Sequence, residues 1–476
     1  MKNKNCHSGK RNEKLFDSLK GTILIMFNKI LIANRGEIAV RVIRACRELG
    51  IKTVAVYSTA DKAALHTLIA DESVCIGPAP SKDSYLNTRA LIAACEVTGA
   101  EAIHPGYGFL SENADFIRLC EKCNIKWIGP PADAVEAMGD KANAKATMKR
   151  AGVPVVPGSE GAVTSVEEAE RIAGEMGYPI LIKASAGGGG RGIRPVHAKD
   201  ELAAQMQASK SEAKAFFGND DVYIEKLVEN PRHVEIQLLA DEHGSVVHLG
   251  ERDCSAQRRN QKLIEEAPCA VMTDELRDRM GQAAIKGAKA CSYTNAGTVE
   301  FLLDKNGDFY FMEMNTRIQV EHPVTEMATG IDLIKAQIKV AAGETLDSMD
   351  IRQKDITFDG HAIECRINAE DPANSFRPSP GRINALHIPG GFGVRLDSAV
   401  FQGYEIPPYY DSMIAKVITR GKTRPEAIQK MRVALSEFMI EGIVSNIDFQ
   451  LELLRDEEFV SGNYDIGFLG RRNEKK

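Results

Sequence analysis

Short apolar runs and amphipathic stretches alternate over the first part of the chain. The runs of strand length, which are typical of buried strands, are 29–34 (KILIAN), 53–58 (TVAVYS) and 127–130 (WIGP). The stretches with apolar residues at helical spacing are 37–49, 87–98 and 112–123. Strands that alternate with helices favour a parallel sheet covered by helices. The pattern therefore predicts an α/β, doubly wound N-terminal domain over residues 26–140.

The pattern changes after residue 140. An apolar strand, a glycine run and a second strand follow in PILIKASAGGGGRGIRPV, which predicts a small glycine-rich lid over 141–228. From residue 229 polar and apolar positions alternate in HVEIQLLA, SVVHLGE, TVEFLL and FYFMEM, as is typical of antiparallel strands. Residues 425–439 return to helical spacing. We therefore predict a C-terminal α+β domain with an antiparallel sheet over 229–470.

Composition excludes several classes of function. The chain has 476 residues, enough for two or three domains, and its net charge of −6 disfavours nucleic acid and anionic membranes as partners. No apolar run approaches the roughly 18 residues of a membrane helix. The ten cysteines are scattered, which fits a reducing cytoplasm. Residues 1–25 are basic and lack the apolar core of a signal peptide, so we predict a disordered extension.

A run of glycines carries the first chemical signal. It comprises Gly187, Gly188, Gly189 and Gly190, followed by Arg191 and Gly192. Glycines cost conformational entropy, so core packing does not explain four of them. They allow backbone N–H groups to approach an anion closely, and Lys183 ends the preceding strand. A flexible hairpin tip is the alternative, but the lysine favours a phosphate-binding lid. The run matches neither a Walker A loop nor the dinucleotide-binding turn.

The second signal is a predicted hairpin with two acidic residues. Asn-Gly is a strong turn signal, and a two-residue loop at Asn306 and Gly307 would place Glu300 opposite Glu313. Two carboxylates that face each other across a sheet repel, and a divalent cation with phosphate oxygens removes that penalty. Asn315 points to the same side. Two solvated glutamates are the alternative, and the nearby glycine run favours a magnesium site.

Two further segments place charged side chains together. If 317–323 (RIQVEHP) is extended, Arg317, Gln319 and Glu321 share one face, which suits a small oxyanion and a proton acceptor. In 361–371 (HAIECRINAED), Arg366 lies on the polar face together with Glu364 and Asn368. A surface salt bridge is the alternative for Arg366 taken alone.

At this point the chain resembles a known family from about Met26 to about Leu469. The segments that carry the resemblance are HPGYGFLSEN (104–113), MGDK (138–141), GGGGRG (187–192), ENPRHVEIQ (229–237), ERDCSAQRRNQKLIEEAP (251–268), MEMNTRIQVEHPVTEM (312–327), ECRINAEDP (364–372) and PPYYDSMIAK (407–416). They are similar to those of biotin carboxylase, a family of the ATP-grasp superfamily. These motifs are long, ordered and mutually consistent.

The resemblance implies a role for each matching residue. The ATP phosphates would meet Lys141, Lys183, His233 and the glycine lid with Gly188, Gly189 and Gly190. Adenine would meet Glu225, Lys226 and Leu227 at its edge and Leu302 and Ile466 at its face, and the ribose would meet Gln257. Magnesium or manganese would bind Glu300, Glu313 and Asn315. Bicarbonate would be held by Lys262, Arg317, Gln319 and Val320, with Glu321 as its base, Arg366 stabilising the biotin enolate and Tyr107 near the biotin.

The implied reaction is the ATP-dependent carboxylation of biotin on a separate carrier protein, through carboxyphosphate. The implied partners are the biotin carboxyl carrier protein, carboxyltransferase subunits and a second copy of the chain in a homodimer. The implied context is acetyl-CoA carboxylase, with a two-subunit pyruvate or propionyl-CoA carboxylase as the alternative. Asn260 and Gly467 depart from residues that some family members have, and neither belongs to the catalytic set.

Three other classes of protein agree less well with these residues. A dinucleotide-binding oxidoreductase lacks support, because NRGEIA follows the first strand in place of the glycine fingerprint. A non-catalytic relative would lack one of the charged residues named above, and all are present. A different ATP-grasp ligase fits less well, because RIQVEHP and Arg366 suit bicarbonate and biotin.

We predict that residues 1–25 are dispensable. They precede the first predicted strand, carry no periodic apolar face, and Met26 is a natural start. A protein that begins at Met26 should retain full bicarbonate-dependent ATP hydrolysis, measured beside the full chain. Loss of soluble, active protein on this truncation would contradict the prediction.

Overall fold

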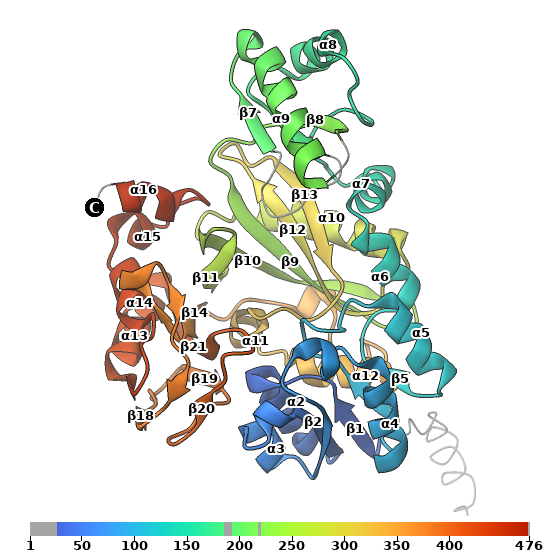
Figure 1. The fold of residues 1–476 in the computed structure, drawn as a ribbon, viewed down its shortest axis with the longest axis vertical. Coiled ribbons are helices and arrows are strands. Elements are labelled where there is room, and N and C mark those ends of the chain that lie inside the picture. Colours follow the sequence, from blue (N-terminus) through green and yellow to red (C-terminus); the bar gives the residue numbers. More distant parts are fainter. Residues whose placement is uncertain (1–25, 185–192, 218–219, 475–476) are drawn as a thin grey trace, which may run out of the picture.

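The computed structural model of the protein describes residues 26–184, 193–217 and 220–474. The predicted extension 1–25 and the glycine run 187–192, with Gly188, Gly189 and Gly190, lie outside the described residues. Three main sheets organise the described chain, and helices pack against each of them (Figure 1).

The N-terminal sheet is parallel, as predicted. Its strands are β1 (Lys29–Ile32), β2 (Lys52–Ser58), β3 (Glu72–Gly77), β4 (Ala102–His104) and β5 (Lys126–Trp127), in the order β3-β2-β1-β4-β5. The sequence pattern missed β3, because half of its side chains are exposed, and β4, because it has only three residues.

Helices cover both faces of this sheet. Ile30 and Ile32 pack in one core with helices α2 (Gly36–Glu48) and α12 (Leu333–Ala341). Leu31 points to the other side and packs in a second core, with α4 (Thr88–Thr98) and α5 (Ala114–Lys122). The doubly wound prediction is therefore confirmed, since alternate residues of one strand meet different helical layers.

An antiparallel sheet of eight strands forms the centre of the molecule. Its order is β13 (Phe309–Asn315), β12 (Asn295–Leu303), β9 (Arg232–Ala240), β10 (Val246–Arg258), β11 (Gln261–Ala267), β14 (His361–Asn368), β21 (Met413–Gly421) and β19 (Val394–Ser398). The four strands predicted from residue 229 onward are β9, β10, β12 and β13. Three two-stranded pairs flank the sheet: β15 (Glu370–Asp371) with β16 (Arg377–Pro378), β17 (Gly381–Arg382) with β20 (Glu405–Ile406), and β18 (Ala385–His387) with β22 (Met439–Glu441).

Strand β9 of this sheet buries apolar side chains on one face and polar side chains on the other. On β9, Val234, Ile236 and Leu238 pack in a core with helix α10 (Asp274–Ala290). The intervening residues His233 and Glu235 point to the opposite face and are also buried. A strand that buries a polar face must provide partners for it, because unpaired buried polar groups cost free energy.

The predicted hairpin of β12 and β13 has a different turn from the expected one. Asp304 and Asp308 are joined by a backbone hydrogen bond, so the loop has three residues, 305–307, and not the two at Asn306 and Gly307. A bulge in β13, opposite Glu300 and Phe301, compensates for the extra loop residue. It leaves Met312 without a partner in the register. Glu300 therefore does face Glu313, as predicted.

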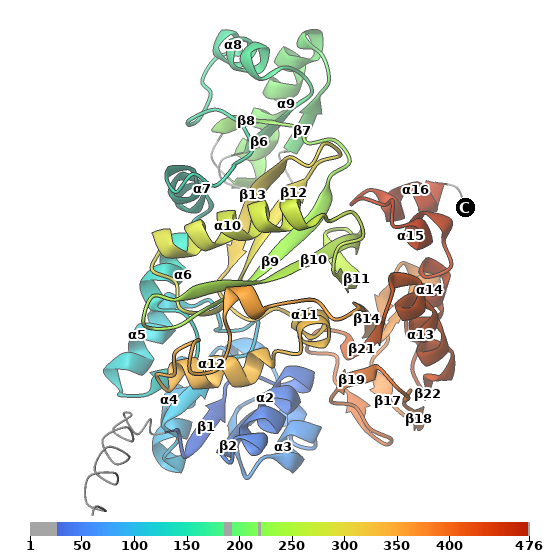
Figure 2. The same cartoon turned by 180° about the vertical axis from the view of Figure 1, so that it is seen from behind.

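A small sheet lies at the end of the molecule farthest from the N-terminal sheet (Figure 2). It pairs β7 (Ile193–Val196), β6 (Ile180–Ala184) and β8 (Val222–Lys226), and it packs against α8 (Val166–Met176) and α9 (Leu202–Phe217). The glycine run connects β6 to β7. Helices α6 (Ala132–Gly139) and α7 (Lys141–Arg150) precede this sheet.

The C-terminal helices cover one face of β14 and β21. They are α13 (Arg424–Glu437), α14 (Ile447–Leu453), α15 (Glu457–Ser461) and α16 (Phe468–Glu474), and they share a core with Cys365, Ile367 and Val417. Among the described residues, no helix combines the length and the apolar character needed to cross a membrane.

A buried carboxylate joins these helices to the central sheet. Glu266 on β11 accepts hydrogen bonds from Arg424 Nε at 2.7 Å and Tyr464 Oη at 2.7 Å, and lies 2.6 Å from His361 Nε2. Burial alone would raise the pKa of Glu266, but His361 and Arg424 outweigh it and lower the pKa to about 2. The folded protein therefore stabilises the ionised form of this group.

We predict that Glu266→Gln destabilises the fold in a pH-dependent way. A carboxyl group with a depressed pKa stabilises the folded state above its ordinary pKa and loses that contribution as the pH falls below it. The pKa of about 2 corresponds to a loss of about 3 kcal/mol of unfolding free energy at neutral pH. The difference in thermal midpoint between the two proteins should shrink as the pH falls below about 4.5. An equal difference at pH 7 and in acid would contradict the prediction.

Candidate active site

Four charged residues form a row across the centre of the sheet. Arg252 on β10 faces Glu235 on β9, Glu235 faces Glu300 on β12, and Glu300 faces Glu313 on β13. Arg252, Glu235 and Glu300 are buried. Three carboxylates on neighbouring strands repel one another unless cations lie between them. The row therefore requires a set of compensating cations.

Lys262 on β11 is the cation that joins most of these carboxylates. Its Nζ lies 2.7 Å from Glu235, 3.0 Å from Glu300 and 2.5 Å from Glu321. Burial would lower the pKa of the Lys262 ammonium, but the surrounding acidic groups outweigh it and raise the pKa well above its ordinary value. Lys262 is therefore a permanent positive charge at the centre of the site.

Glu321 lies between two cations. Its Oε1 accepts from Lys262, and its Oε2 accepts from Arg366 Nη2 at 2.8 Å. Burial would raise its pKa, but Lys262, Arg366 and the nearby Arg252 together lower the pKa well below its ordinary value. The carboxylate is therefore ionised in the absence of substrate.

The segment that carries Glu321 is not extended, contrary to prediction. Residues 316–320 have no regular structure, and Glu321 is the N-cap of helix α11 (His322–Thr329). Pro323 in the first turn is a helix-start signal that the period-two reading overlooked. Gln319 and Glu321 still converge on the buried row. Arg317 turns away toward Glu112 and Asn315, with Nε 3.0 Å from Glu112 Oε2.

Arg366 on β14 lies beside the row on its polar face, as predicted. Its Nε donates to Glu265 Oε1 on β11 at 2.5 Å. Burial is the main cause that raises the pKa of Glu265, to about 7, although Arg366 opposes it. Cys365, which directly precedes Arg366, points into the apolar core on the other face of β14.

Arg252 is the residue that sequence reasoning missed at the centre of the site. It is fully buried, and its guanidinium donates to Glu235 at 2.5 Å and to Gln319 Oε1 at 2.7 Å. Further donations reach Gln237, Thr298 and Thr325. The alternation in HVEIQ could have indicated Glu235, because it places that residue on one face with His233. No local pattern marks an arginine as fully buried.

The site can supply oxygen ligands to a divalent cation. Glu300 Oε1 accepts from Asn315 Nδ2 at 2.9 Å, and its Oε2 lies 2.8 Å from His233 Nε2. Glu313 pairs with Lys141 at 3.6 Å, and its side chain is 42% exposed. The carboxylates of Glu300 and Glu313 are the kind of ligand that Mg²⁺ prefers, whereas Asn315 turns its Nδ2 toward Glu300 and its Oδ1 toward Arg317.

In the metal-free protein, cations compensate the predicted repulsion between Glu300 and Glu313. Glu300 shares Lys262 with Glu235 and Glu321, and Glu313 pairs with Lys141. Burial opposes ionisation of Glu300, but Lys262 and His233 lower its pKa well below the ordinary value. His233, Glu235 and Glu300 also offer ligand atoms within 4.8 Å of one another.

The residues expected to meet the nucleotide fall into two groups. In the small sheet, Glu225 binds Lys183 at 2.5 Å and Lys145 at 2.6 Å, so the predicted phosphate and adenine residues are in direct contact. The backbone N–H groups of Lys226 and Leu227 donate to Pro157 and Pro179. Lys141 begins α7 and is largely exposed.

The second group lies on the large sheet. Leu302 on β12 faces His233 on β9, and the Ile466 N–H donates to the carbonyl of Pro231 just before that strand. Gln257 faces Lys262 across β10 and β11. These predicted adenine, ribose and phosphate contacts therefore adjoin the buried charges.

Tyr107 and Val320 are both linked to Lys416, Tyr107 through Glu37 and Val320 directly. The Tyr107 hydroxyl donates to Glu37, and Lys416 Nζ lies 3.2 Å from Glu37 and 2.8 Å from the carbonyl oxygen of Val320. Sequence reasoning identified neither Glu37 nor Lys416.

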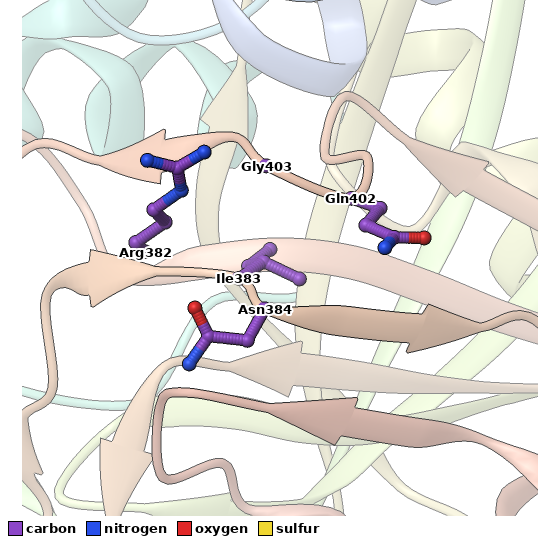
Figure 3. A pocket seen from close by; sticks show the side chains of 5 residues that line it. All are labelled: Arg382, Ile383, Asn384, Gln402 and Gly403. Atoms are coloured by element: carbon purple, nitrogen blue, oxygen red, sulfur yellow. The ribbon is translucent and has the colours of Figure 1, made fainter.

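A surface pocket of about 610 Å³ lies apart from these charges. It is lined by Arg382, Ile383, Asn384, Gln402 and Gly403, none of which belongs to the network above. Figure 3 shows the polar side chains of Arg382 and Asn384 directed to different sides of the pocket. The pocket therefore does not gather groups for one ligand, and the buried charge network is the better candidate for chemistry.

Models of known families match three successive parts of the chain. The model of the biotin carboxylase N-terminal domain matches residues 26–135, and that of the biotin carboxylase C-terminal domain matches 364–471. The ATP-binding domain of the carbamoyl-phosphate synthase L chain matches 140–349. Biotin carboxylase 1 of Bacillus subtilis is 62% identical over 445 residues, which are 93% of this chain and 98% of that protein. A pyruvate carboxylase subunit of Methanothermobacter thermautotrophicus is 58% identical over 445 residues, 93% of this chain and 90% of that one.

Solved structures agree in fold. A biotin carboxylase–beta-gamma-ATP complex from Campylobacter jejuni has a TM-score of 0.86 at 52% identity and covers 94% of this chain and 99% of its own. The biotin carboxylase domain dimer of Hydrogenobacter thermophilus 2-oxoglutarate carboxylase, in complex with MgADP, ADP and bicarbonate, has a TM-score of 0.85 at 52% identity. It covers 94% of this chain and 98% of its own.

We predict that Glu300→Gln and Glu313→Gln differ in stability but share a metal defect. Both should raise the Mg²⁺ concentration needed for half-maximal ATP turnover by about 10- to 100-fold or more, since each removes a charged ligand. Only Glu300→Gln should lower the thermal midpoint of the metal-free protein, because it breaks a buried pair worth about 3–5 kcal/mol. The exposed Glu313 pair contributes about 0–1 kcal/mol.

A magnesium titration of ATP hydrolysis and a melting curve without metal measure the two effects separately. Lys149→Gln on α7 is a matched control, since it removes another ion pair, with Glu160, away from the row. Unchanged magnesium dependence in both glutamine variants would contradict the assigned metal ligands.

Proposed function

Because the chain belongs to the biotin carboxylase family and is an ATP-dependent biotin carboxylase, we propose that the buried charge network is where bicarbonate is activated and biotin is carboxylated. The observation that carries this proposal is the position of Glu321. Its carboxylate lies between Lys262, the proposed bicarbonate cation, and Arg366, the proposed biotin cation.

The nucleotide is proposed to lie between the small sheet and the large one. Lys141, Lys183, His233 and Gly188–Gly190 hold its phosphates in this proposal. Glu225, Lys226 and Leu227 meet the adenine edge, Leu302 and Ile466 its face, and Gln257 the ribose. The Lys183–Glu225 contact supports this arrangement, because it places a predicted phosphate residue beside a predicted adenine residue. Nucleotide binding would exchange that ion pair for phosphate contacts.

Magnesium is proposed to bind Glu300, Glu313 and Asn315, and manganese could take the same oxygen ligands. When bound, the metal offsets negative charge on the phosphate oxygens of ATP. Lys262 and His233 hold Glu300 in place before the metal arrives. Glu313 is the more exposed of the two carboxylates.

Bicarbonate is proposed to bind Lys262, Arg317, Gln319 and Val320, and Arg317 would exchange its contacts with Glu112 and Asn315 for the anion. An anion at Lys262 competes for the positive charge that now lowers the pKa of Glu321. The carboxylate then accepts the bicarbonate proton more readily, and a bicarbonate oxygen attacks the γ-phosphorus of ATP. The bond to ADP breaks and carboxyphosphate forms. Burial of Gln319 and Glu321 helps to exclude water from the unstable intermediate.

Carboxyphosphate is proposed to break down to CO₂ and phosphate beside Arg366. The phosphate takes the ureido proton of biotin, and the biotin nitrogen then forms its bond to CO₂. Arg366 offsets the negative charge on the enolate oxygen of biotin, and Tyr107 adjoins the ring. The guanidinium is oriented for this role by Glu265 and Glu321 on two sides.

The biotin is proposed to come on a carboxyl carrier protein, and the carboxyl group to pass to carboxyltransferase subunits. We propose acetyl-CoA carboxylase in the cytoplasm as the setting and a homodimer as the assembly. A two-subunit pyruvate or propionyl-CoA carboxylase is the second candidate, and a pyruvate carboxylase subunit 58% identical to this chain favours it. Co-purification of the carboxyltransferase partner would distinguish the two settings.

We predict that Glu321→Ala abolishes most bicarbonate-dependent activity. Loss of a general base costs about 10²–10⁴-fold in rate, and Glu321→Gln should act alike because its amide cannot accept the proton. ATP hydrolysis with bicarbonate and free biotin measures the rate. Binding of MgADP by calorimetry should change by no more than about twofold, because Glu321 pairs with Lys262 and Arg366, neither of which is a proposed nucleotide residue.

Glu326→Gln is the matched control for this substitution. Glu326 is a buried carboxylate on the same helix, but it pairs with Arg41 at 2.9 Å and Arg395 at 2.7 Å outside the network. Turnover of the Glu326→Gln variant should stay close to that of the wild type. Near-normal turnover of Glu321→Ala would remove this residue from the mechanism.

A further inference from the structure

Lys416 is a fully buried lysine to which the mechanism above gives no role. It lies on β21, in register with Arg366 on β14 and with Asp397 on β19. Burial would lower the pKa of its ammonium, but the nearby acidic groups outweigh it and raise the pKa. A cation of this kind is retained at a cost in desolvation, so its contacts indicate what it does.

The ammonium of Lys416 joins three parts of the chain. It donates to the carbonyl oxygen of Val320 at 2.8 Å, pairs with Glu37 of α2 at 3.2 Å, and lies 4.0 Å from Asp397 on β19. Val320 immediately precedes Glu321. The loop 316–320 has no regular structure, so side-chain contacts such as this one must hold its backbone in place.

The geometry therefore points to Lys416 as a positioning residue of the carboxylation reaction: it fixes the carbonyl of Val320 and thereby the place of Glu321 relative to Lys262 and Arg366. Arg252 fixes the same loop from the other side through Gln319. The two buried cations together hold the loop that carries the proposed base. This inference rests on the proposed role of Glu321.

The same ammonium links the bicarbonate loop to the proposed biotin contact. Glu37 accepts a hydrogen bond from the Tyr107 hydroxyl on one oxygen and pairs with Lys416 through that same oxygen, Oε1. Its other oxygen is buried without a hydrogen-bond partner, so Glu37 depends on these two contacts. Lys416 therefore couples the position of Tyr107 to that of Val320.

The test is Lys416→Met, which keeps most of the length of the side chain and removes the charge. We expect KM for bicarbonate to rise or kcat to fall, with a combined loss of about 10- to 100-fold, because a small displacement of a reacting group costs that much. The affinity for MgADP should change by no more than about twofold, since no proposed nucleotide residue contacts Lys416. Lys416→Met with Glu37→Gln removes the buried pair together and serves if the single variant does not fold.

Thr419→Val on the same strand is the matched control. The Thr419 hydroxyl donates to Ala427 on the opposite face of the sheet, so this change also removes a buried hydrogen bond. It should lower the thermal midpoint while leaving KM for bicarbonate unchanged. If Lys416 were only structural, its variants would lose MgADP affinity and bicarbonate kinetics in parallel, and this result would overturn the inference.

Measuring Glu321→Ala alongside the Lys416 variants separates the proposed function from the role of Lys416. If Glu321→Ala retains turnover, the proposed base is wrong. If Glu321→Ala is inactive while a folded variant without the Lys416 ammonium has bicarbonate kinetics within about twofold of the wild type, the proposed function stands and the role of Lys416 falls.

Discussion

The structure depends on balancing several buried carboxylates at the centre of one sheet. Glu235 and Glu300 face each other on adjacent strands, and Glu321 enters the same space from the end of a loop. Lys262 contacts all three, so its single charge is shared among them. Buried charges are tolerated only when they are paired and hydrogen-bonded, so the position of each group fixes that of its neighbours.

This balance also prepares the site for anions. The groups that neutralise the carboxylates in the free protein, Lys262 and Arg366, are those proposed to meet bicarbonate and biotin. A substrate anion therefore enters a site whose cations are already in place and takes over part of their ion pairing. Such exchange costs little reorganisation, which is how preorganised charges lower a reaction barrier. It also means that the proposed base is held ionised until the substrate arrives.

The sequence predicted the parts whose signal is local. The apolar runs located β1 and β2, and the alternation in HVEIQLLA located β9. It did not predict that RIQVEHP leaves the strand and starts a helix, because the period-two reading overlooked the helix-start signal of Pro323. Arg252 and Lys416 were missed because their burial depends on tertiary contacts. A charged residue in a strand looks solvated until the fold shows what covers it.

The hairpin of β12 and β13 shows that the facing of two proposed metal ligands depends on two irregularities of the backbone. Its three-residue loop shifts the pairing by one residue, and the bulge at Met312 shifts it back before Glu300 and Glu313. The two irregularities offset each other in the pairing of the two strands. Removing either one alone would turn Glu313 to the wrong face of the sheet, because side chains alternate along a strand. Removing both would leave the pair intact, so a shorter turn is compatible with the same chemistry.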